Sequence, residues 1–269
     1  MYQRGRAMKV FQKDEFHFHY RDEGDPNGPP LVFSNSLGTD PRLWDQILPL
    51  LPKGLRIIRY DMRGHGLSDC PSAPYSMGGL VSDIEALMDY LKVKDSMFVG
   101  LSIGGMIGQG LATKRRDLIR SMVLSNTAAK IATPDIWRER IASIRENGMD
   151  LVADASISRW FSPKMLAGQS KAPWHNMLRA TRAEGYIGCA HAIAGTDFIT
   201  PTSALRLPVM GIAGDHDSST PADLVRETLD LIPGSQFHLI KGAGHAPCIE
   251  QPATFAKLLS DFLTSTSHI

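Results

Sequence analysis

The chain has 269 residues, of which 43% are hydrophobic and 21% charged, enough for one large core with an insertion but cramped for two independent domains. Its 29 Lys and Arg residues nearly balance its 28 Asp and Glu residues. The resulting net charge of +1 gives no reason to expect nucleic acid or another polyanion as a partner. Selectivity must therefore come from local groups.

The cysteines are odd in number and widely spaced, at Cys70, Cys189 and Cys248. This spacing argues against a disulfide framework or a zinc cluster and favours free thiols in a reducing cytoplasm. The basic segment 1–8 lacks the apolar core of a signal peptide, and no stretch approaches the roughly 20 apolar residues that span a bilayer. We therefore predict a soluble, cytoplasmic protein without a membrane partner, metal or cofactor. Residues 1–8 are interpreted as an N-terminal extension, with either Met1 or Met8 as the start.

Aromatic residues and histidines alternate over residues 10–20, which predicts a β-hairpin with one buried face. His17 and His19 have the spacing of a metal-ligand pair, but no third ligand is nearby, so we interpret them as solvated strand positions. A turn cluster at 24–30 leads to a buried strand at 31–33. A helical segment at about 41–51 and another buried strand at 54–61 follow.

Helical and strand patterns then alternate along the chain. Residues 77–93 carry apolar side chains at spacings of three and four, which predicts an amphipathic helix. A strand leading to residue 102, a helix at about 103–113 and a strand at 121–125 complete a βαβα pattern, typical of a mostly parallel sheet with helices on both faces. The pattern resumes with strands at 207–213 and 236–240 and helices at 221–231 and 252–263.

Residues 127–200 interrupt this alternation. They lack a convincing strand pattern and carry helical stretches at 134–147, 149–161, 172–182 and 184–194. We interpret them as a helical cap inserted into the sheet domain, although ordinary packing helices would give a similar pattern. The predicted division is thus a core of residues 9–126 and 201–264 with a cap of residues 127–200.

The segment GLSIG at residues 100–104 places Ser102 between a predicted strand and a predicted helix. This is the pattern of a nucleophile elbow, a sharp turn that strains the central residue and exposes its hydroxyl. Gly100 and Gly104 keep Cβ atoms out of the turn, and the helix N-terminus offers backbone donors. The pattern alone also fits a glycine-rich bend with a solvated serine, so the interpretation depends on partners downstream.

A serine nucleophile needs a base and a group that orients the base. His245 lies in a glycine-rich loop after the strand at 236–240, and Asp217 lies just beyond the strand at 207–213. The three residues follow the carboxyl ends of parallel strands, so we expect Ser102, Asp217 and His245 to converge at one edge of the sheet.

Other residues compete for these roles. Asp215 lies in the same loop as Asp217 and remains an alternative acid. His216 and His65 are weaker candidates for the base. For His65, in an Arg-Gly-His-Gly turn, we expect a structural role in bracing the active-site loops.

Acyl transfer also needs two donors for the oxyanion. We assign them to the backbone N–H of Ile103, directly after Ser102, and to that of Leu37, in the loop after the strand at 31–33.

The motifs together resemble the α/β-hydrolase superfamily over about residues 9–263. They are the elbow, YDMRGHG at 60–66, Gly214-x-x-Asp217-x-x-x-Pro221 and GAGHAPCIEQP at 242–252. A narrower set is similar to the 3-oxoadipate enol-lactonase family of the β-ketoadipate pathway. It comprises SNSLGTD at 34–40, GLSIGG at 100–105, SNTAAKI at 125–131, Trp137 and MLRA at 177–180, with Ile103 where that family usually has Met.

This resemblance implies hydrolysis of a small anionic enol-lactone to 3-oxoadipate in aromatic catabolism. The substrate carboxylate would need a cationic partner, and an Arg fork binds carboxylate in a bidentate manner. Arg140 is our candidate for this role among the cap arginines, and Trp137 and Trp160 are candidate pocket walls. The cap arginines considered are Arg138, Arg140, Arg159 and Arg179.

Several alternatives share the fold. A carbon–carbon bond hydrolase is disfavoured because Ala246, rather than Trp, follows His245, and a dehalogenase because its nucleophile is Asp. A general carboxylesterase or a cofactor-free haloperoxidase remains open, since pocket shape decides between them. A ligand receptor on a hydrolase scaffold is the alternative that is not an enzyme. The sequence leaves the oligomeric state open.

Overall fold

The structure, a computed structural model, describes residues 8–269, so residues 1–7 of the predicted extension lie outside the described residues. Within this range one sheet has eight strands in the order β1-β2-β4-β3-β5-β6-β7-β8. The pairs β1–β2 and β2–β4 are antiparallel, and the remaining pairs are parallel. The strands are β1 (Lys9–Lys13), β2 (Phe16–Gly24), β3 (Pro30–Ser34), β4 (Arg56–Tyr60), β5 (Ser96–Leu101), β6 (Ile119–Ser125), β7 (Val209–Gly214) and β8 (Gln236–Ile240).

Helices follow most of the parallel strands. They are α1 (Met77–Tyr90), α2 (Ile103–Lys114), α3 (Pro134–Asn147), α4 (Met149–Trp160), α5 (Pro163–Ala167), α6 (Ala172–Ala180), α7 (Ala183–Ala194), α8 (Ile199–Ser203), α9 (Ala222–Asp230), α10 (Pro247–Glu250) and α11 (Pro252–Ser265). Three short 3₁₀ helices are η1 (Pro41–Trp44), η2 (Leu48–Leu50) and η3 (Gln169–Lys171).

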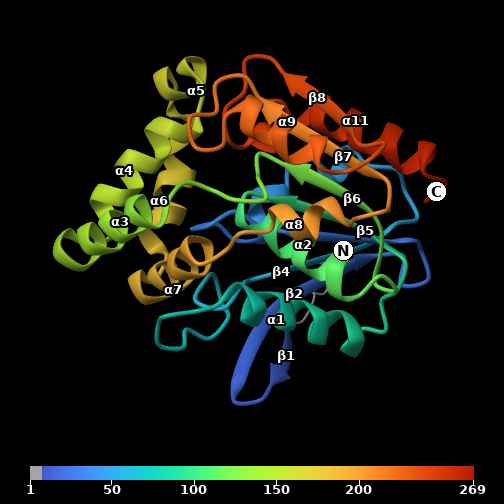
Figure 1. Ribbon diagram of the computed structural model, residues 1–269, viewed down its shortest axis with the longest axis horizontal. Coiled ribbons are helices and arrows are strands. Elements are labelled where there is room, and N and C mark those ends of the chain that lie inside the picture. The colour runs from blue at the N-terminus through green and yellow to red at the C-terminus, as the bar shows by residue number, and fades with distance from the viewer. Residues whose placement is uncertain (1–7) are drawn as a thin grey trace, which may run out of the picture.

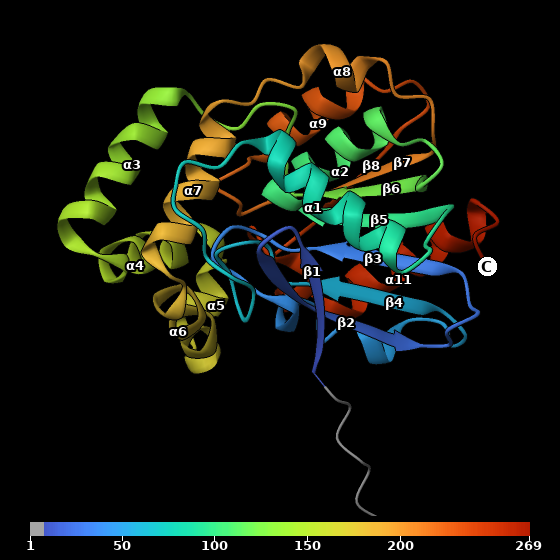
Figure 2. The same ribbon diagram turned by 90° about the horizontal axis from the view of Figure 1, so that it is seen from below.

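The central strands are buried on both faces. All residues of β5 and β7 are buried, which is why these segments are continuous apolar runs without polar alternation. Helices α1, α2 and α8 cover one face of the sheet and α11 covers the other (Figures 1 and 2). The predicted mostly parallel sheet with helices on both faces is therefore confirmed.

The helices α3–α7, residues 134–194, lie between β6 and β7 in the chain and form one group beside the sheet, which we call the cap. In both views this group projects at the left of the molecule, and the arrowheads of β3 and β4 point toward it (Figure 2). The cap thus covers the edge where the carboxyl ends of the parallel strands meet, the usual position of a site in such sheets.

The helical segment predicted at about 41–51 is present only in part, as two short 3₁₀ helices instead of one continuous helix. The segment forms η1 and η2, which are separated by a turn. Pro49 lacks a backbone N–H and restricts Leu48 before it, so a continuous α-helix is disfavoured. The short helices α5, α8 and α10 were not predicted, because they have four or five residues and show no periodicity.

The interpretation of His19 as a solvated position is wrong. His19 is buried, and its Nδ1 lies 2.7 Å from Asp61 Oδ2, while His17 is exposed as expected. The partner comes from the end of β4, so the hairpin sequence alone gave no sign of it.

Among the described residues, the cysteines Cys70, Cys189 and Cys248 are free thiols. In the same part of the chain, no group of three or more His, Cys, Asp or Glu side chains is arranged to hold a metal ion. None of its helices has the length and apolar character required to cross a membrane.

Candidate active site

Ser102 lies at the junction between β5 and α2, in strained backbone geometry with φ 57° and ψ −120°. The turn is tight because glycine lets backbone segments approach. A Cβ on Gly104 would lie 2.2 Å from the carbonyl oxygen of Ser34, and one on Gly100 would lie 2.4 Å from the carbonyl oxygen of Gly104. The end of β3 therefore lies directly against the first turn of α2.

Asp217 follows β7 and is buried with its carboxylate fully hydrogen-bonded. Oδ1 accepts from the N–H groups of Ser219 and Thr220, at 2.7 and 3.2 Å. Oδ2 accepts from Thr220 Oγ1 at 2.7 Å and from Asn126 Nδ2 at 2.9 Å, and it lies 2.8 Å from His245 Nδ1. Burial by itself would raise the pKa of Asp217, but the attraction of His245 and these hydrogen bonds outweigh it and lower the pKa below its ordinary value. The carboxylate stays ionised, as an orienting group requires.

His245 follows β8 and is 2% exposed. Its backbone N–H donates to the carbonyl of Trp160 at 2.6 Å, and the two side-chain rings lie 5.6 Å apart between centroids. Glu250 reinforces this contact, because it accepts from Gly244 N–H at 2.6 Å and from Ser162 N–H and Oγ at 3.0 and 2.5 Å. The loop that carries His245 is therefore fastened to the C-terminal end of α4.

Ser102 Oγ and His245 Nε2 have no hydrogen-bond partner among residues 8–269, so no direct Ser102–His245 hydrogen bond is formed. Catalytic hydrogen bonds are often long without substrate and tighten in the complex. Both atoms are left available to a third group.

Two backbone donors are also free, one in the elbow itself and one in the loop after β3, which packs against Gly104 through Ser34 and Asn35. Leu37 is 4% exposed and Ile103 is fully buried, yet the N–H of neither residue has a partner in the described part of the chain. More than nine-tenths of buried backbone N–H groups are paired in proteins, so two free ones at this position need an explanation. The N–H of Ile103 is free because it starts α2, where the helix offers no acceptor.

The alternative acid and base lie elsewhere in the same loops. Asp215 accepts from the N–H groups of Gly242 and Ala243, at 2.7 and 3.3 Å, and so shapes the turn before His245. His216 is exposed and lies 3.9 Å from Asp215. Asp217, and not Asp215, contacts His245.

The two candidate pocket-wall residues of the cap, Trp160 and Trp137, make different contacts. Trp160 packs against His245, as described above. Trp137 donates from Nε1 to the carbonyl of Ile131 at 2.8 Å, and its ring lies 4.6 Å from the Arg140 guanidinium. Trp137 and Trp160 are both buried, so each contributes to cap packing as well as to any pocket wall.

Arg140 and Arg159 differ from the other cap arginines in our list. Arg138 pairs with Asp135, and Arg179 with Asp150 at 2.7 Å, whereas Arg140 and Arg159 form no ion pair with any described residue. Burial, and next the charge of Arg140, lower the pKa of Arg159. The Nε atom of Arg159 is buried with no partner among the described residues. Two half-buried cations close enough to interact would be stabilised by an anion.

Sequence patterns alone did not identify three residues that shape this site: Asn126, Thr220 and Glu250. Asn126 directly follows β6, beside β7 in the sheet, and Thr220 lies three residues after the candidate acid Asp217. Asn126 and Glu250 also fall within the motifs at 125–131 and 242–252, and these positions are the available signal. Their hydrogen bonds show that the site is held by neighbours contributed from separate loops.

Comparison with known proteins identifies the fold family. The family described as alpha/beta hydrolase fold matches residues 29–252. The chain belongs to this family. The α/β-hydrolase order of elements explains why the elbow follows β5 while the candidate acid and base follow β7 and β8.

Individual α/β hydrolases are similar over nearly the whole chain. The 3-oxoadipate enol-lactonase 2 of Acinetobacter baylyi is 33% identical over 240 residues, covering 88% of this chain and 89% of that protein. The solved structure of the enol-lactonase from Burkholderia xenovorans LB400 has a TM-score of 0.90 and 35% identity, covering 95% and 100% of the two chains. A hydrolase from Pseudomonas aeruginosa PA01 has a TM-score of 0.92 and 33% identity, covering 97% and 99%.

Proposed function

We propose that this α/β hydrolase opens 3-oxoadipate enol-lactone to 3-oxoadipate, with Ser102, His245 and Asp217 as its catalytic triad. The observation that carries the reaction class is the pair of free N–H groups on two buried residues: Ile103, directly after the strained Ser102, and Leu37, in the loop that packs against Gly104. The similarity to enol-lactonases over about nine-tenths of the chain supports the substrate.

In the proposed first step, His245 Nε2 takes the proton of Ser102 Oγ, and Oγ attacks the lactone carbonyl carbon. Asp217 holds His245 Nδ1–H and stabilises the imidazolium that forms. The carbonyl oxygen becomes an oxyanion, which accepts from the N–H groups of Leu37 and Ile103. The free donors then have the partner that the unliganded site lacks.

The tetrahedral intermediate collapses by breaking the ring C–O bond. The leaving oxygen departs as part of an enolate that remains tethered to the acyl group. The α-carbon of this enolate gains a proton, His245 gives up the one it took from Ser102, and the leaving group ends as a ketone. Water then attacks the acyl-enzyme, giving its proton to His245, and the second collapse returns that proton to Ser102 Oγ and releases the acid. Each proton taken by His245 is returned within one turnover.

We assign recognition of the substrate carboxylate to Arg140, with Arg159 beside it. The absence of an ion-pair partner for either residue within residues 8–269 supports this assignment. Trp137 holds the Arg140 guanidinium over its ring, and Trp160 forms a wall beside His245. We also propose that residues 127–200, which include the cap helices α3–α7, act as a substrate-binding cap on a core of residues 9–126 and 201–264. This segment supplies all four of these side chains. The free thiols favour the cytoplasm as the place of reaction.

A substrate panel tests the proposal. Initial rates are compared for 3-oxoadipate enol-lactone, p-nitrophenyl acetate and a ring-fission dienoate. We expect kcat/KM for the lactone to exceed that for the ester by at least about 100-fold. Faster turnover of the simple ester would identify a general carboxylesterase, and turnover of the dienoate a carbon–carbon bond hydrolase. Halogenation of monochlorodimedone with peroxide tests the haloperoxidase alternative, and ligand binding without turnover of any of these compounds would favour a receptor.

A further inference from the structure

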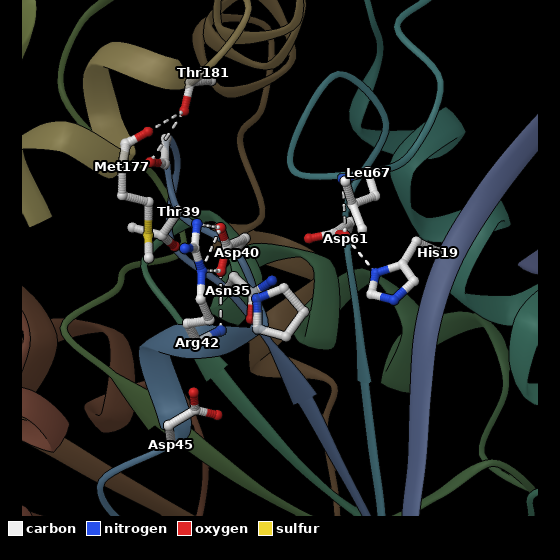
Figure 3. A network of polar contacts seen from close by, with 12 residues as sticks. His19, Asn35, Thr39, Asp40, Arg42, Asp45, Asp61, Leu67, Met177 and Thr181 are labelled. Carbon is white, nitrogen blue, oxygen red and sulfur yellow. Dashed lines mark hydrogen bonds and ion pairs between the residues drawn. The ribbon is translucent and has the colours of Figure 1, made fainter. Parts of the chain in front are cut away.

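Both backbone polar groups of Gly38, the residue after Leu37, are held by side chains. The N–H of Gly38 donates to His65 Nε2 at 2.9 Å, and the carbonyl of Gly38 lies 3.2 Å from Thr181 Oγ1 at the end of α6. The Thr181 hydroxyl also lies 3.1 Å from the carbonyl of Met177, and Figure 3 shows it shared between the two acceptors. A hydroxyl has one proton, so its hold on Gly38 is partial and His65 is the stronger anchor.

The hydrogen bonds of His65 fix its tautomer. A backbone N–H can only donate, so Nε2 of His65 must be unprotonated, and Nδ1–H then donates to the carbonyl of Arg63 at 3.1 Å. Burial lowers the pKa of His65 below its ordinary value of 6.5 and so favours this neutral form. His65 is 1% exposed, and both ring nitrogens are in use.

The preceding peptide group is held as well. The carbonyl of Ser36 accepts from Thr39 N–H at 3.2 Å and from Thr39 Oγ1 at 2.8 Å. In a trans peptide the N–H points opposite to the carbonyl, so Leu37 N–H is directed away from Thr39. The Ser36–Leu37 and Leu37–Gly38 peptide groups are thus both fixed, the first through its carbonyl and the second through its N–H, and the N–H of Leu37 remains free within the described chain.

Packing alone does not hold this loop. Thr39, Asp40 and Thr181 border a cavity of about 370 Å³ together with Arg42 and Met177, all of which are labelled in Figure 3. On the other side the fit is close, because a Cβ on Gly38, at φ +77°, would lie 2.4 Å from Leu178 Cδ2. A segment next to an unfilled space depends on polar anchors for its exact position.

We propose that His65 is a positioning residue for the oxyanion loop, residues 35–39. Its neutral Nε2 accepts from the N–H of Gly38 and thereby directs the N–H of Leu37 toward the substrate oxyanion that forms when Ser102 attacks. This inference rests on the proposed function for the role of Leu37, although any ester substrate would reveal it. His65 touches no reacting atom and acts through the loop.

Two amide variants distinguish the hydrogen bond between Gly38 N–H and His65 Nε2 from the packing of the His65 side chain. The amide of His65→Gln reaches about the place of Nε2 and offers an acceptor to Gly38, whereas the shorter His65→Asn reaches only the Arg63 side. With p-nitrophenyl acetate we expect kcat of His65→Asn to fall roughly 10- to 100-fold at nearly constant KM, and His65→Gln to keep most of the activity. Inhibition by phenylboronic acid, whose tetrahedral adduct uses the same donors, should weaken in parallel.

His268→Asn is the matched control. His268 is also buried, and its Nε2 lies 3.0 Å from the carbonyl of Pro30, at the opposite end of β3 from the oxyanion loop. The His268→Asn substitution should lower the melting temperature and leave kcat unchanged. Equal kcat losses in His65→Gln and His65→Asn, or a loss expressed only in KM, would overturn the proposal.

A second pair of variants tests the same proposal if the His65→Asn protein does not fold. Thr181→Val removes the hydroxyl on the other side of Gly38, and Thr181→Ser keeps it. We expect kcat of Thr181→Val to fall, but by less than the 10- to 100-fold expected for His65→Asn, and kcat of Thr181→Ser to stay near the wild-type value. Equal kcat values in the two Thr181 variants would contradict control of the oxyanion loop through Gly38. Because the ester is the substrate, these outcomes do not depend on whether the enzyme prefers the enol-lactone.

Discussion

Asn126 joins the candidate acid to the loop of the candidate base. Its Nδ2 lies 2.9 Å from Asp217 Oδ2 and 3.2 Å from the carbonyl of Gly244, the residue before His245. Its own Oδ1 accepts from Ser125 Oγ at 2.9 Å. One side chain at the end of β6 therefore sets the spacing between the loops that follow β7 and β8.

Replacing Asn126 should weaken this alignment. Asn126→Gly retains the positive φ of 47° that the position requires and removes both donors. A hydrogen bond to a charged group contributes about 1.5 to 3 kcal/mol, so we expect kcat/KM to fall roughly 10- to 100-fold. Steady-state kinetics with the lactone measures this, and Asn176→Gly, at an exposed cap position, should have little effect. Full activity in Asn126→Gly would show that the acid does not need this donor.

Asp217 and Asp215 offer a direct comparison. Asp217→Asn keeps the shape but lets His245 adopt the wrong tautomer, and the analogous change in serine proteases costs about 10⁴ in kcat. Asp215→Asn should reduce kcat far less, because Asp215 contacts only the backbone of the turn at Gly242 and Ala243 among the hydrogen bonds of the described chain. Similar losses in the two variants would argue against the assignment of the acid.

Ser102→Ala should abolish turnover, by roughly 10⁴-fold or more, without unfolding the protein. Activity and melting temperature are measured on the same preparation. Ser121→Ala is the control, since Ser121 Oγ is buried on β6 without a partner among the described residues and its loss should not slow catalysis. Lactone hydrolysis retained in Ser102→Ala would contradict the proposed mechanism.

The unpaired cap cations should matter for an anionic substrate. Arg140→Gln and Arg159→Gln should each raise KM for the lactone about tenfold, the equivalent of 1.4 kcal/mol, and change KM for p-nitrophenyl acetate little. Arg138→Gln, whose guanidinium already pairs with exposed Asp135, should change neither value. Equal effects on the charged and neutral substrates would exclude carboxylate recognition by these residues.

The lowered pKa of His65 predicts a dependence of stability on pH. In the unfolded chain this histidine takes up a proton near its ordinary pKa of 6.5, while in the native protein the pKa is lower. The stabilisation is therefore complete above about pH 6.5 and is lost as the pH falls toward the native pKa. His65→Gln cannot titrate, so its melting temperature should fall less than that of the wild type between about pH 7.5 and pH 5.5. Nearby Asp61, Asp40 and Arg182 remain in both proteins, as does His268 with its own lowered pKa. Equal falls in melting temperature for the wild type and His65→Gln over this pH range would show that His65 is not the source of the pH dependence.

Sequence patterns predicted most of the sheet because its strands are apolar runs that end at glycine, proline and polar residues. They also located the loops of Ser102, Asp217 and His245, since chain order and strand ends are local features. They failed at His19, which is buried against Asp61 after β4, and they missed the break in the helical segment at 41–51, where Pro49 disfavours a continuous α-helix. They gave no physical reason for choosing Arg140 over Arg138, because only the folded cap shows which guanidinium already has a carboxylate partner.

The carboxylate of Glu250 has a consequence for engineering. It accepts from Gly244 in the loop of the candidate base and from Ser162 in the cap, while the Trp160 carbonyl accepts from the N–H of His245. A cap transplanted from another hydrolase to change specificity would have to supply both the carbonyl and the hydroxyl at the end of its second helix. Without them, the graft would alter the rate of chemistry along with the choice of substrate. Exchange of α3 alone, with α4, Ser162 and α6 retained, avoids this loss and also keeps the contacts of Leu178 and Thr181 with Gly38.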